Sequence, residues 1–280
     1  MARSIFGLAL AALATLSLPV QSASVSANYK LAPSHAGDED LVTAFDFYDL
    51  AVGASVIKAV AGNTGTATAP VVGDKFTGYF QSYVAGHQLG GATQSAPNLN
   101  TLGSGTGYEL TLVAQFNEEI TAVSAFNFTS TINSGSATLY FDTTPDHNFL
   151  TDSGFTDGDV LLTGTISSGG GVSVPQFFAG FAQIDLSVNS LATSVFTPGI
   201  TGVNGVFSLD LRSTAVNGVA SVRGQFPGAG GLILGSDGAL TLRATPAPIP
   251  LPAAAWLLGS ALSVLPVLRR RRVSPSLATR

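Results

Sequence analysis

Apolar and polar residues alternate along many stretches of this chain, and this period of two constrains its fold more than any other feature. Tyr108, Leu110 and Leu112 would share one face of an extended segment, with Glu109 and Thr111 on the opposite, polar face. A step of two places every second side chain on the same face of a strand, and no stretch sustains a helical period. Candidate strands lie at residues 41–50, 75–84, 108–116, 120–129, 137–141, 160–166, 182–188, 207–212, 218–226 and 240–244.

Clusters rich in glycine, asparagine and aspartate separate these segments. Glycine adopts positive φ without strain, and Asn or Asp tolerates it, so such clusters favour hairpins and loops. We therefore expect turns at residues 62–65, 103–107, 133–135, 169–171, 228–231 and 236–238. Glu118 and Glu119, which follow Phe116, are expected to form a further hairpin turn.

The composition agrees with a chain of many short strands. Only 10% of the residues are charged and 32 are glycine, whereas helices need surface Glu, Lys and Arg. The pattern predicts an all-β fold with one antiparallel β-sandwich or jelly-roll-like domain at residues 24–245. A signal helix and a transmembrane helix are expected on either side of that domain.

Residues 1–23 have the organisation of a secretory signal peptide. Arg3 precedes an apolar run at residues 5–20, and small residues follow at 22–24. This order predicts export and removal by signal peptidase, after Ser22 or after Ala23. A retained membrane anchor is the alternative, but the run is short and contains Pro19.

Residues 246–280 have three parts: a proline-rich linker, an apolar span and a basic tail. The span at 251–268 carries no charge, and as a helix it would reach roughly 27 Å, close to the thickness of a bilayer core. Four arginines, Arg269–Arg272, follow at once and should stop translocation. The pattern predicts a membrane span with its arginines in the cytoplasm; a buried core helix, the alternative, would not end in four arginines.

The same C-terminal segment resembles the PEP-CTERM class of sorting signals, in the variant written V-P-L-P-A. Ile249 stands in the usual valine place, and an eight-residue tail follows the arginines. The resemblance rests on Pro248, Ile249, Pro250, Leu251, Pro252, Ala253, Trp256, Arg269, Arg270, Arg271 and Arg272.

This resemblance implies recognition by an exosortase, a membrane cysteine protease-transpeptidase. It also implies a Gram-negative host that makes exopolysaccharide. The protein would pass through an inner-membrane intermediate and reach the cell surface or the extracellular matrix.

A second resemblance covers roughly residues 40–170. The segments at 73–81, 107–111, 139–142 and 154–158 are similar to flocculation-associated PEP-CTERM proteins. Such proteins are exported and take part in holding cells and exopolysaccharide together. The resemblance transfers no site residues.

Charge and cysteine content exclude several partners and chemistries. Between Arg3 and Arg269 the chain has 6 basic and 17 acidic residues, and 6 − 17 gives a net charge of −11. This segment would repel phosphate backbones, so nucleic acid is not expected as a partner. The absence of Cys excludes disulfides, cysteine metal sites and a thiol nucleophile.

The densest acidic segment, residues 142–159, is a candidate calcium site. Calcium takes six to eight oxygen ligands from flexible loops, although the spacing does not match a known calcium loop. Ordinary turn chemistry between two strands is the alternative. Asp38, Glu39 and Asp40 form a smaller acidic group, expected in a solvated segment. The candidate ligands are Asp142, Asp146, Asn148, Asp152, Asp157 and Asp159.

No catalytic motif is present, so we do not expect an enzyme. The chain lacks G-x-S-x-G, a P-loop and a pair of histidines at metal-ligand spacing. His147 lies among aspartates and could act as a base, but a solvated loop histidine is the simpler interpretation. Two alternatives remain open. One is a calcium-assisted carbohydrate-binding module, with aromatics of residues 76–83 stacking on sugars; the other is an extracellular hydrolase, by fold analogy.

Overall fold

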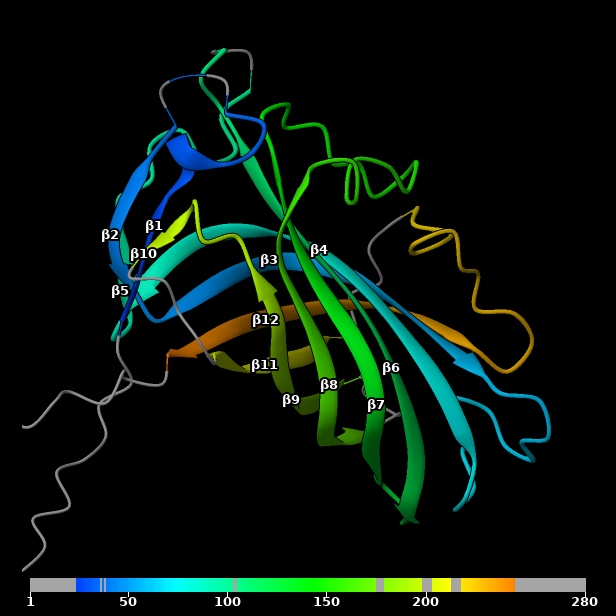
Figure 1. The fold of residues 1–280 in the computed structure, drawn as a ribbon. Helices are drawn as coiled ribbons and strands as arrows, with labels where there is room; N and C mark the ends of the chain where they lie inside the picture. Colours follow the sequence, from blue (N-terminus) through cyan, green and yellow to red (C-terminus); the bar gives the residue numbers. More distant parts are fainter. Residues whose placement is uncertain are drawn as a thin grey trace, which may run out of the picture. The chain divides into compact units, whose positions relative to one another are not determined.

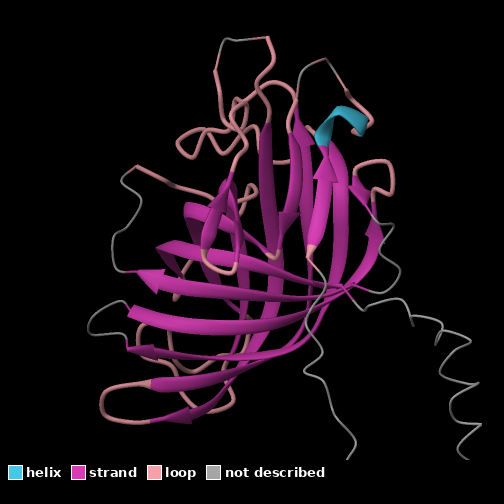
Figure 2. Cartoon of the chain, turned by 90° about the vertical axis from the view of Figure 1, so that its left-hand side faces the viewer, coloured by secondary structure: helices cyan, strands magenta, loops and turns pink. Residues whose placement is uncertain are grey.

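The computed structural model describes residues 24–35, 37, 39–102, 105–174, 179–197, 203–212 and 218–244. By its internal contacts the chain divides into two compact units, Met1–Thr245 and Pro246–Arg280, and the described residues all lie in the first. Almost all of the regular structure in these described residues is strand, with one short helical turn (Figure 2). The all-β prediction is confirmed.

The described residues form twelve strands and one 3₁₀ turn. In chain order these are β1 (Val25–Asn28), η1 (Tyr29–Leu31), β2 (Leu41–Phe45), β3 (Phe47–Ala59), β4 (Lys75–Leu89), β5 (Ala92–Gln94), β6 (Glu109–Val123), β7 (Phe128–Asp142), β8 (Asp159–Val174), β9 (Ala179–Leu191), β10 (Phe196–Thr197), β11 (Val203–Arg212) and β12 (Leu232–Ala244).

The main sheet is antiparallel and curls until it closes on itself. Its nine strands follow the order β3-β12-β11-β9-β8-β7-β6-β4-β5, and β3 also pairs with β4. Because β5 pairs only with β4, the other eight strands form a closed ring. In Figure 1, β7, β8 and β9 cross in front of β3 and β12, so opposite walls of the ring face each other like the layers of a sandwich. A second sheet, β10-β1-β2, has three strands.

Three of the expected turns are instead irregular points inside long strands. Residues 133–135, 169–171 and 236–238 lie within β7, β8 and β12. The register of β12 with β3 shifts between Ser236 and Gly238, and the extra residue lies on β3, between Leu50 and Gly53. In β8 a Cβ on Gly169 would lie 2.7 Å from the carbonyl oxygen of Gln183. The glycines therefore serve close approach and strand bending, and the turn predictions at these points were wrong.

The expected hairpin at Glu118 and Glu119 was also wrong. Strand β6 runs on to Val123, and the chain turns at residues 124–127, where the amide of Ser124 donates to the carbonyl of Asn127 at 2.8 Å. The strand expected at 218–226 was wrong as well. These residues, all of which are described, form a loop with one isolated bridge between Val222 and Gln225.

Aromatic side chains fill much of the core inside the closed sheet. Tyr48, Phe80, Tyr108 and Phe141 are fully buried, and each such ring contributes about 1.5–3 kcal/mol by leaving water. The N-terminal segment completes this core, because Tyr29 of η1 is also fully buried and its ring stacks on Phe141 with 5.9 Å between centroids.

His87 is the polar centre of this aromatic core. Its Nε2 lies 2.6 Å from the hydroxyl of Tyr29, and the rings of Phe45 and Tyr48 lie within 5.1 Å of its own. Among the described residues its Nδ1 has no hydrogen-bond partner. Burial lowers the pKa of His87 to about 4, because the apolar surroundings disfavour the imidazolium.

The acidic group at residues 39–40 is buried, against the expectation of a solvated segment. Glu39 is 2% exposed and Asp40 is 7% exposed. Asp40 accepts hydrogen bonds from the amide and side chain of Asn98 at 2.9 and 3.1 Å, and the Tyr108 hydroxyl lies 3.3 Å away. The carboxylate therefore ties the N-terminal segment to the loop after β5. Asp38 lies outside the described residues.

Candidate functional site

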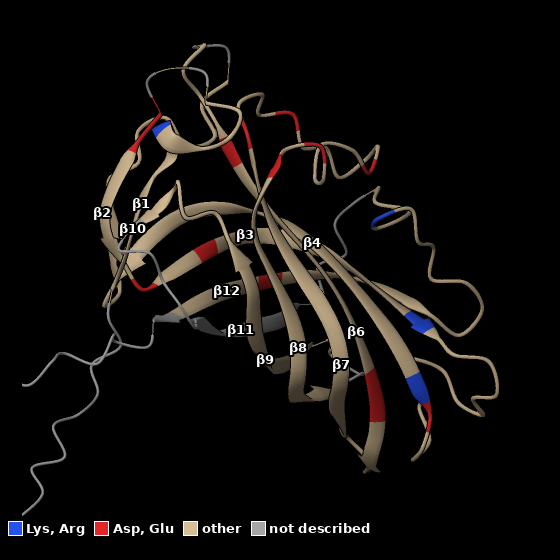
Figure 3. Cartoon of the chain, in the orientation of Figure 1, with Lys and Arg blue, Asp and Glu red and all other residues tan. Residues whose placement is uncertain are grey.

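The loop between β7 and β8 folds back over the outer face of β6. The loop's acidic residues gather at the end of the sheet where β7 ends and β8 begins (Figure 3). The hydroxyl of Thr111 on β6 donates to the carbonyl of Phe155 at 2.9 Å, and Phe155 is 3% exposed. The polar face of β6 is therefore covered by a loop.

Glu109 is the residue that this loop buries most completely. It is fully buried, although the alternating pattern had placed it on the polar face of its strand. Its Oε1 accepts hydrogen bonds from the amides of Asp146 and His147, both at 3.2 Å. Its Oε2 lies 2.5 Å from Nδ1 of His147. The period of two identified the face correctly, but the loop that covers this face is a tertiary feature.

His147 is held by stacking as well as by Glu109. Its ring stacks on Tyr83 of β4 with 4.1 Å between centroids, and the rings of Phe149 and Phe155 lie 6.0 and 5.8 Å away. The side chain is 21% exposed. His147 is therefore a positioned residue rather than a solvated loop histidine, and that sequence interpretation was wrong.

Three carboxylates meet beside this pair. Glu109 and Asp142 are directly opposite in the β6–β7 register, so their side chains share one face. Glu109, Asp142 and Asp146 each offer an oxygen within 4.8 Å of the others. Burial raises the pKa of Asp142 and of Asp146, and the nearby charge of Asp157 raises both further. Glu109 is buried, Asp142 is half-buried and Asp146 is exposed, so the cluster combines partial desolvation with mutual repulsion, and a bound cation would offset the repulsion.

The other candidate calcium ligands have different surroundings. Asn148 Oδ1 accepts from the amides of Leu150 and Thr151 in a local turn. Asp159 opens β8 and pairs with Phe141. The structure thus brings Asp142 and Asp146 together with Glu109, which was not among the ligands predicted from the sequence.

Asp152 joins two loops. Its Oδ1 accepts from the amide of Arg223 at 2.9 Å, and its Oδ2 accepts from the amide of Gly224 at 2.6 Å and from the hydroxyl of Ser221 at 2.8 Å. Both oxygens are therefore used in holding the 218–231 loop against the β7–β8 loop.

The aromatic strand β4 is covered on both faces. Phe76 and Phe80 are buried in the core, at 2% and 0% exposure. Tyr79 packs with the small cluster of Ala54, Val56, Val219 and Val222, and Tyr83 stacks on His147. Rings on the outer face of β4 are therefore half-buried under the two loops.

The sorting-signal residues, Pro248 to Trp256 and Arg269 to Arg272, lie outside the described residues, as does the predicted signal peptide. Among the residues that are described, no helix has the length and apolar character needed to cross a bilayer.

Comparison of the chain with protein-family models, with curated proteins and with solved structures gave no match.

Proposed function

We propose that this chain is an exported, non-enzymatic surface or matrix protein of a Gram-negative bacterium, processed by signal peptidase and sorted by an exosortase. One observation carries the proposal: the order Pro-Ile-Pro-Leu-Pro-Ala-Ala-Ala-Trp at 248–256, apolar span at 251–268 and Arg269–Arg272. The division of the chain at Thr245 and Pro246 supports it, because a sorting signal must be separable from the body that it sorts.

The sorting step is tested by two truncations in the native host. Deletion from Pro248 onward removes the whole signal, whereas deletion of 273–280 removes only the tail after the arginines. Cell fractionation and surface labelling should show loss of surface display for the first and no change for the second. Normal display of the longer truncation would refute sorting by this segment. Mass spectrometry of the displayed protein should show both ends removed.

The biological role that we propose is cell aggregation or association with exopolysaccharide. A strain without this protein should form looser aggregates, and the full chain should restore them while the chain truncated at Pro248 should not. Unchanged aggregation in the strain without this protein would refute the proposed role in aggregation and would leave the sorting proposal unaffected.

A second candidate function is calcium-assisted carbohydrate binding. The observation that favours it is the group of Glu109, Asp142 and Asp146, whose oxygens lie within 4.8 Å of one another. Calcium prefers carboxylate oxygens, and ion binding to the folded state alone raises stability by mass action. Calcium should therefore raise the melting temperature relative to EDTA, and the effect should be lost in a D142N/D146N variant. A matched control is Asp185→Asn on the exposed surface of β9.

No thermal shift with calcium, or an equal shift in the D142N/D146N variant, would end the calcium proposal. A glycan array with and without calcium then tests the carbohydrate. Hydrolysis of exopolysaccharide by the purified chain, abolished by Glu109→Gln, would instead favour the hydrolase alternative, since the buried Glu109 and the half-buried His147 are the acid–base pair of this region.

A further inference from the structure

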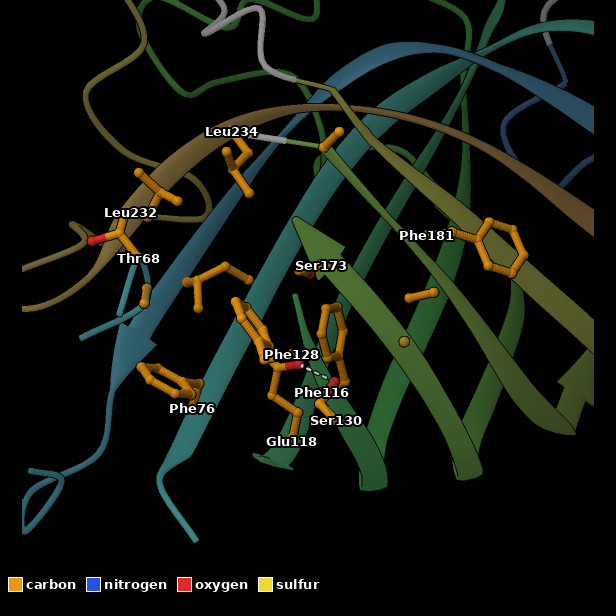
Figure 4. A pocket seen from close by; sticks show the side chains of 15 residues that line it. Thr68, Phe76, Phe116, Glu118, Phe128, Ser130, Ser173, Phe181, Leu232 and Leu234 are labelled. Atoms are coloured by element: carbon orange, nitrogen blue, oxygen red, sulfur yellow. Dashed lines mark hydrogen bonds between the residues drawn. The ribbon is translucent and has the colours of Figure 1, made fainter. Parts of the chain in front are cut away.

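A pocket opens inside the ring, between its opposite walls. It is lined from β3, β4 and β12 on one side and from β6, β7, β8 and β9 on the other (Figure 4). The pocket has a volume of about 60 Å³, and exposed residues such as Thr68 and Phe181 mark where it meets solvent. Most of its lining is apolar, including Phe76, Phe116 and Phe128.

Glu118 is the one titratable side chain among the described residues that line this pocket. It lies two residues after the buried Phe116 on β6, so the strand's alternation directs both side chains to the interior. Ser130 lies on β7 two residues after Phe128, which also lines the pocket. The hydroxyl of Ser130 donates to Glu118 Oε2 at 2.9 Å, as the dashed line in Figure 4 shows.

This carboxyl group is incompletely satisfied by the protein. Ser130 is the only hydrogen-bond partner of Glu118 among the described residues, although an ionised carboxylate can accept several bonds. Desolvation raises the pKa of Glu118, which reflects the cost of holding its charge in this apolar setting. Glu118 is half-buried and has one donor, whereas the fully buried Glu109 has three partners, so Glu118 keeps acceptor capacity for a ligand.

We propose that this pocket binds a small organic cation: an ammonium group on a short apolar chain or ring. The ammonium would donate to Glu118, and the apolar part would lie among the phenyl rings. Figure 4 shows the rings of Phe116 and Phe128 beside Glu118, and an aromatic face attracts a cation as well as burying hydrocarbon.

Charge complementarity selects this class over other apolar ligands. An organic anion would be repelled by Glu118. The ammonium of Lys75 lies 3.8 Å from Glu119 and forms its ion pair there. A neutral hydrocarbon would bury the carboxylate further without supplying a donor, which costs free energy. The small volume of the pocket favours a chain of few carbons.

The test is calorimetric titration of the purified full chain with three ligands that share one alkyl chain: hexylammonium, hexanol and hexanoate. Hexylammonium should bind at least about tenfold more tightly than the other two, because a charge-assisted hydrogen bond is stronger than a neutral one. Equal binding of hexanol, or no binding of hexylammonium, would overturn the proposal.

Two variants place the ligand. Glu118→Gln should weaken hexylammonium about tenfold or more and leave hexanol within about twofold. Glu119→Gln, its exposed neighbour, is the matched control and should change neither. Ser173→Phe should block the pocket, since Ser173 is part of its lining. Unchanged hexylammonium binding by Glu118→Gln would refute the role of Glu118.

If the Glu118→Gln variant does not fold, the pH dependence of hexylammonium binding by the unsubstituted chain tests the role of Glu118 instead. The alkylammonium stays charged throughout the acidic range, so binding should be lost as Glu118 is protonated. Lys75 and Glu119 are the charged neighbours to consider, and the Glu119→Gln variant controls for them. Binding that is independent of pH through the titration of carboxyl groups would overturn the proposal.

Discussion

A few polar side chains buried at full depth distinguish this molecule from a simple β-sheet with an apolar interior. Glu109 and His87 have no measurable exposure, and Asp40 has little. Burying a polar group costs free energy unless the group is hydrogen-bonded. The number of hydrogen-bond partners around each group therefore indicates how many bonds its substitution would remove. Glu109 has three donors or partners, whereas His87 leaves one ring nitrogen without any among the described residues.

Substituting Glu109 should destabilise the protein strongly. Glu109→Ala leaves the amides of Asp146 and His147 and the ring of His147 without their acceptor, and the free energy of unfolding should fall by about 2–4 kcal/mol. Glu119→Ala on the same strand removes only an exposed ion pair with Lys75 and should cost less than about 1 kcal/mol. Urea unfolding measures the free energy of unfolding of both variants. An equal decrease in the two would contradict the prediction.

The buried His87 should make stability depend on pH. Its folded-state pKa of about 4 lies below the ordinary value of roughly 6.5, so the unfolded chain takes up the proton first as the pH falls. The contribution to the free energy of unfolding should decrease by about 3 kcal/mol between about pH 6.5 and about pH 4, with no further change below that.

His87→Gln removes this contribution and gives the comparison. Urea unfolding at a series of pH values should show the two curves converging on acidification, since only the protein with His87 loses this part of its stability. Parallel curves would show that His87 titrates normally in the folded state.

At the scale of elements, the two outer loops behave as one layer because Asp152 joins them. Asp152→Asn replaces one accepting oxygen by a nitrogen that cannot accept, so at least one bond to Ser221, Arg223 or Gly224 is lost. We expect the stability to fall by about 1–2 kcal/mol and the amides of Arg223 and Gly224 to exchange hydrogen faster. Asp157 in the same loop is exposed, so Asp157→Asn should change neither the stability nor the exchange of these amides. Equal exchange rates in the two variants would contradict the role of Asp152 in joining the loops.

Close packing between β4 and β6 gives a second prediction for an element. A Cβ on Gly78 would lie 2.4 Å from the ring of Phe116, its partner across the strands. Gly78→Ala should therefore cost about 1–3 kcal/mol by displacing this ring. On the same strand, a Cβ on Gly86 would meet its nearest atom, in Thr93, at 3.9 Å, so Gly86→Ala should be nearly neutral. Thermal unfolding compares them, and a neutral Gly78→Ala would contradict the contact.

Most strands could be predicted from the sequence, and most irregularities within them could not. The alternation at 108–116 locates β6 because one face of that strand packs in the core. Gly169 and Gly238 mislead because glycine marks a turn, a bulge and a close approach equally well in a sequence. The contacts with the neighbouring strand determine which of these three roles a glycine has, and these contacts cannot be identified from the local sequence.

The candidate site could be predicted in part. Asp142 and Asp146 stand out as acidic residues of one loop, but Glu109 joins them through strand register, 33 and 37 residues away in sequence (142 − 109 and 146 − 109). Glu118 could have been noticed as an acidic residue in phase with Phe116, had the strand been extended through it.

At the scale of the whole molecule, the body should fold without the two ends. The hydrophobic core of the described residues lies between Val25 and Leu242, and the chain divides after Thr245. A chain of residues 24–245 should unfold cooperatively in urea, with the same midpoint as the body in the full chain. Loss of cooperative unfolding would show that one of the ends belongs to the folded body.

The closed meander also orders the events by which the molecule is made. Each strand of the ring except β3 pairs with a strand that precedes it in the chain. β3 pairs with β4 along one edge, and its other edge stays open until β12, which ends at Ala244. Joining elements so far apart in sequence carries the largest loop-closure entropy in the fold. Throughout synthesis, therefore, this edge of β3 stays unpaired, and a nascent chain stalled before its final strand has backbone groups available to a chaperone or to another nascent copy.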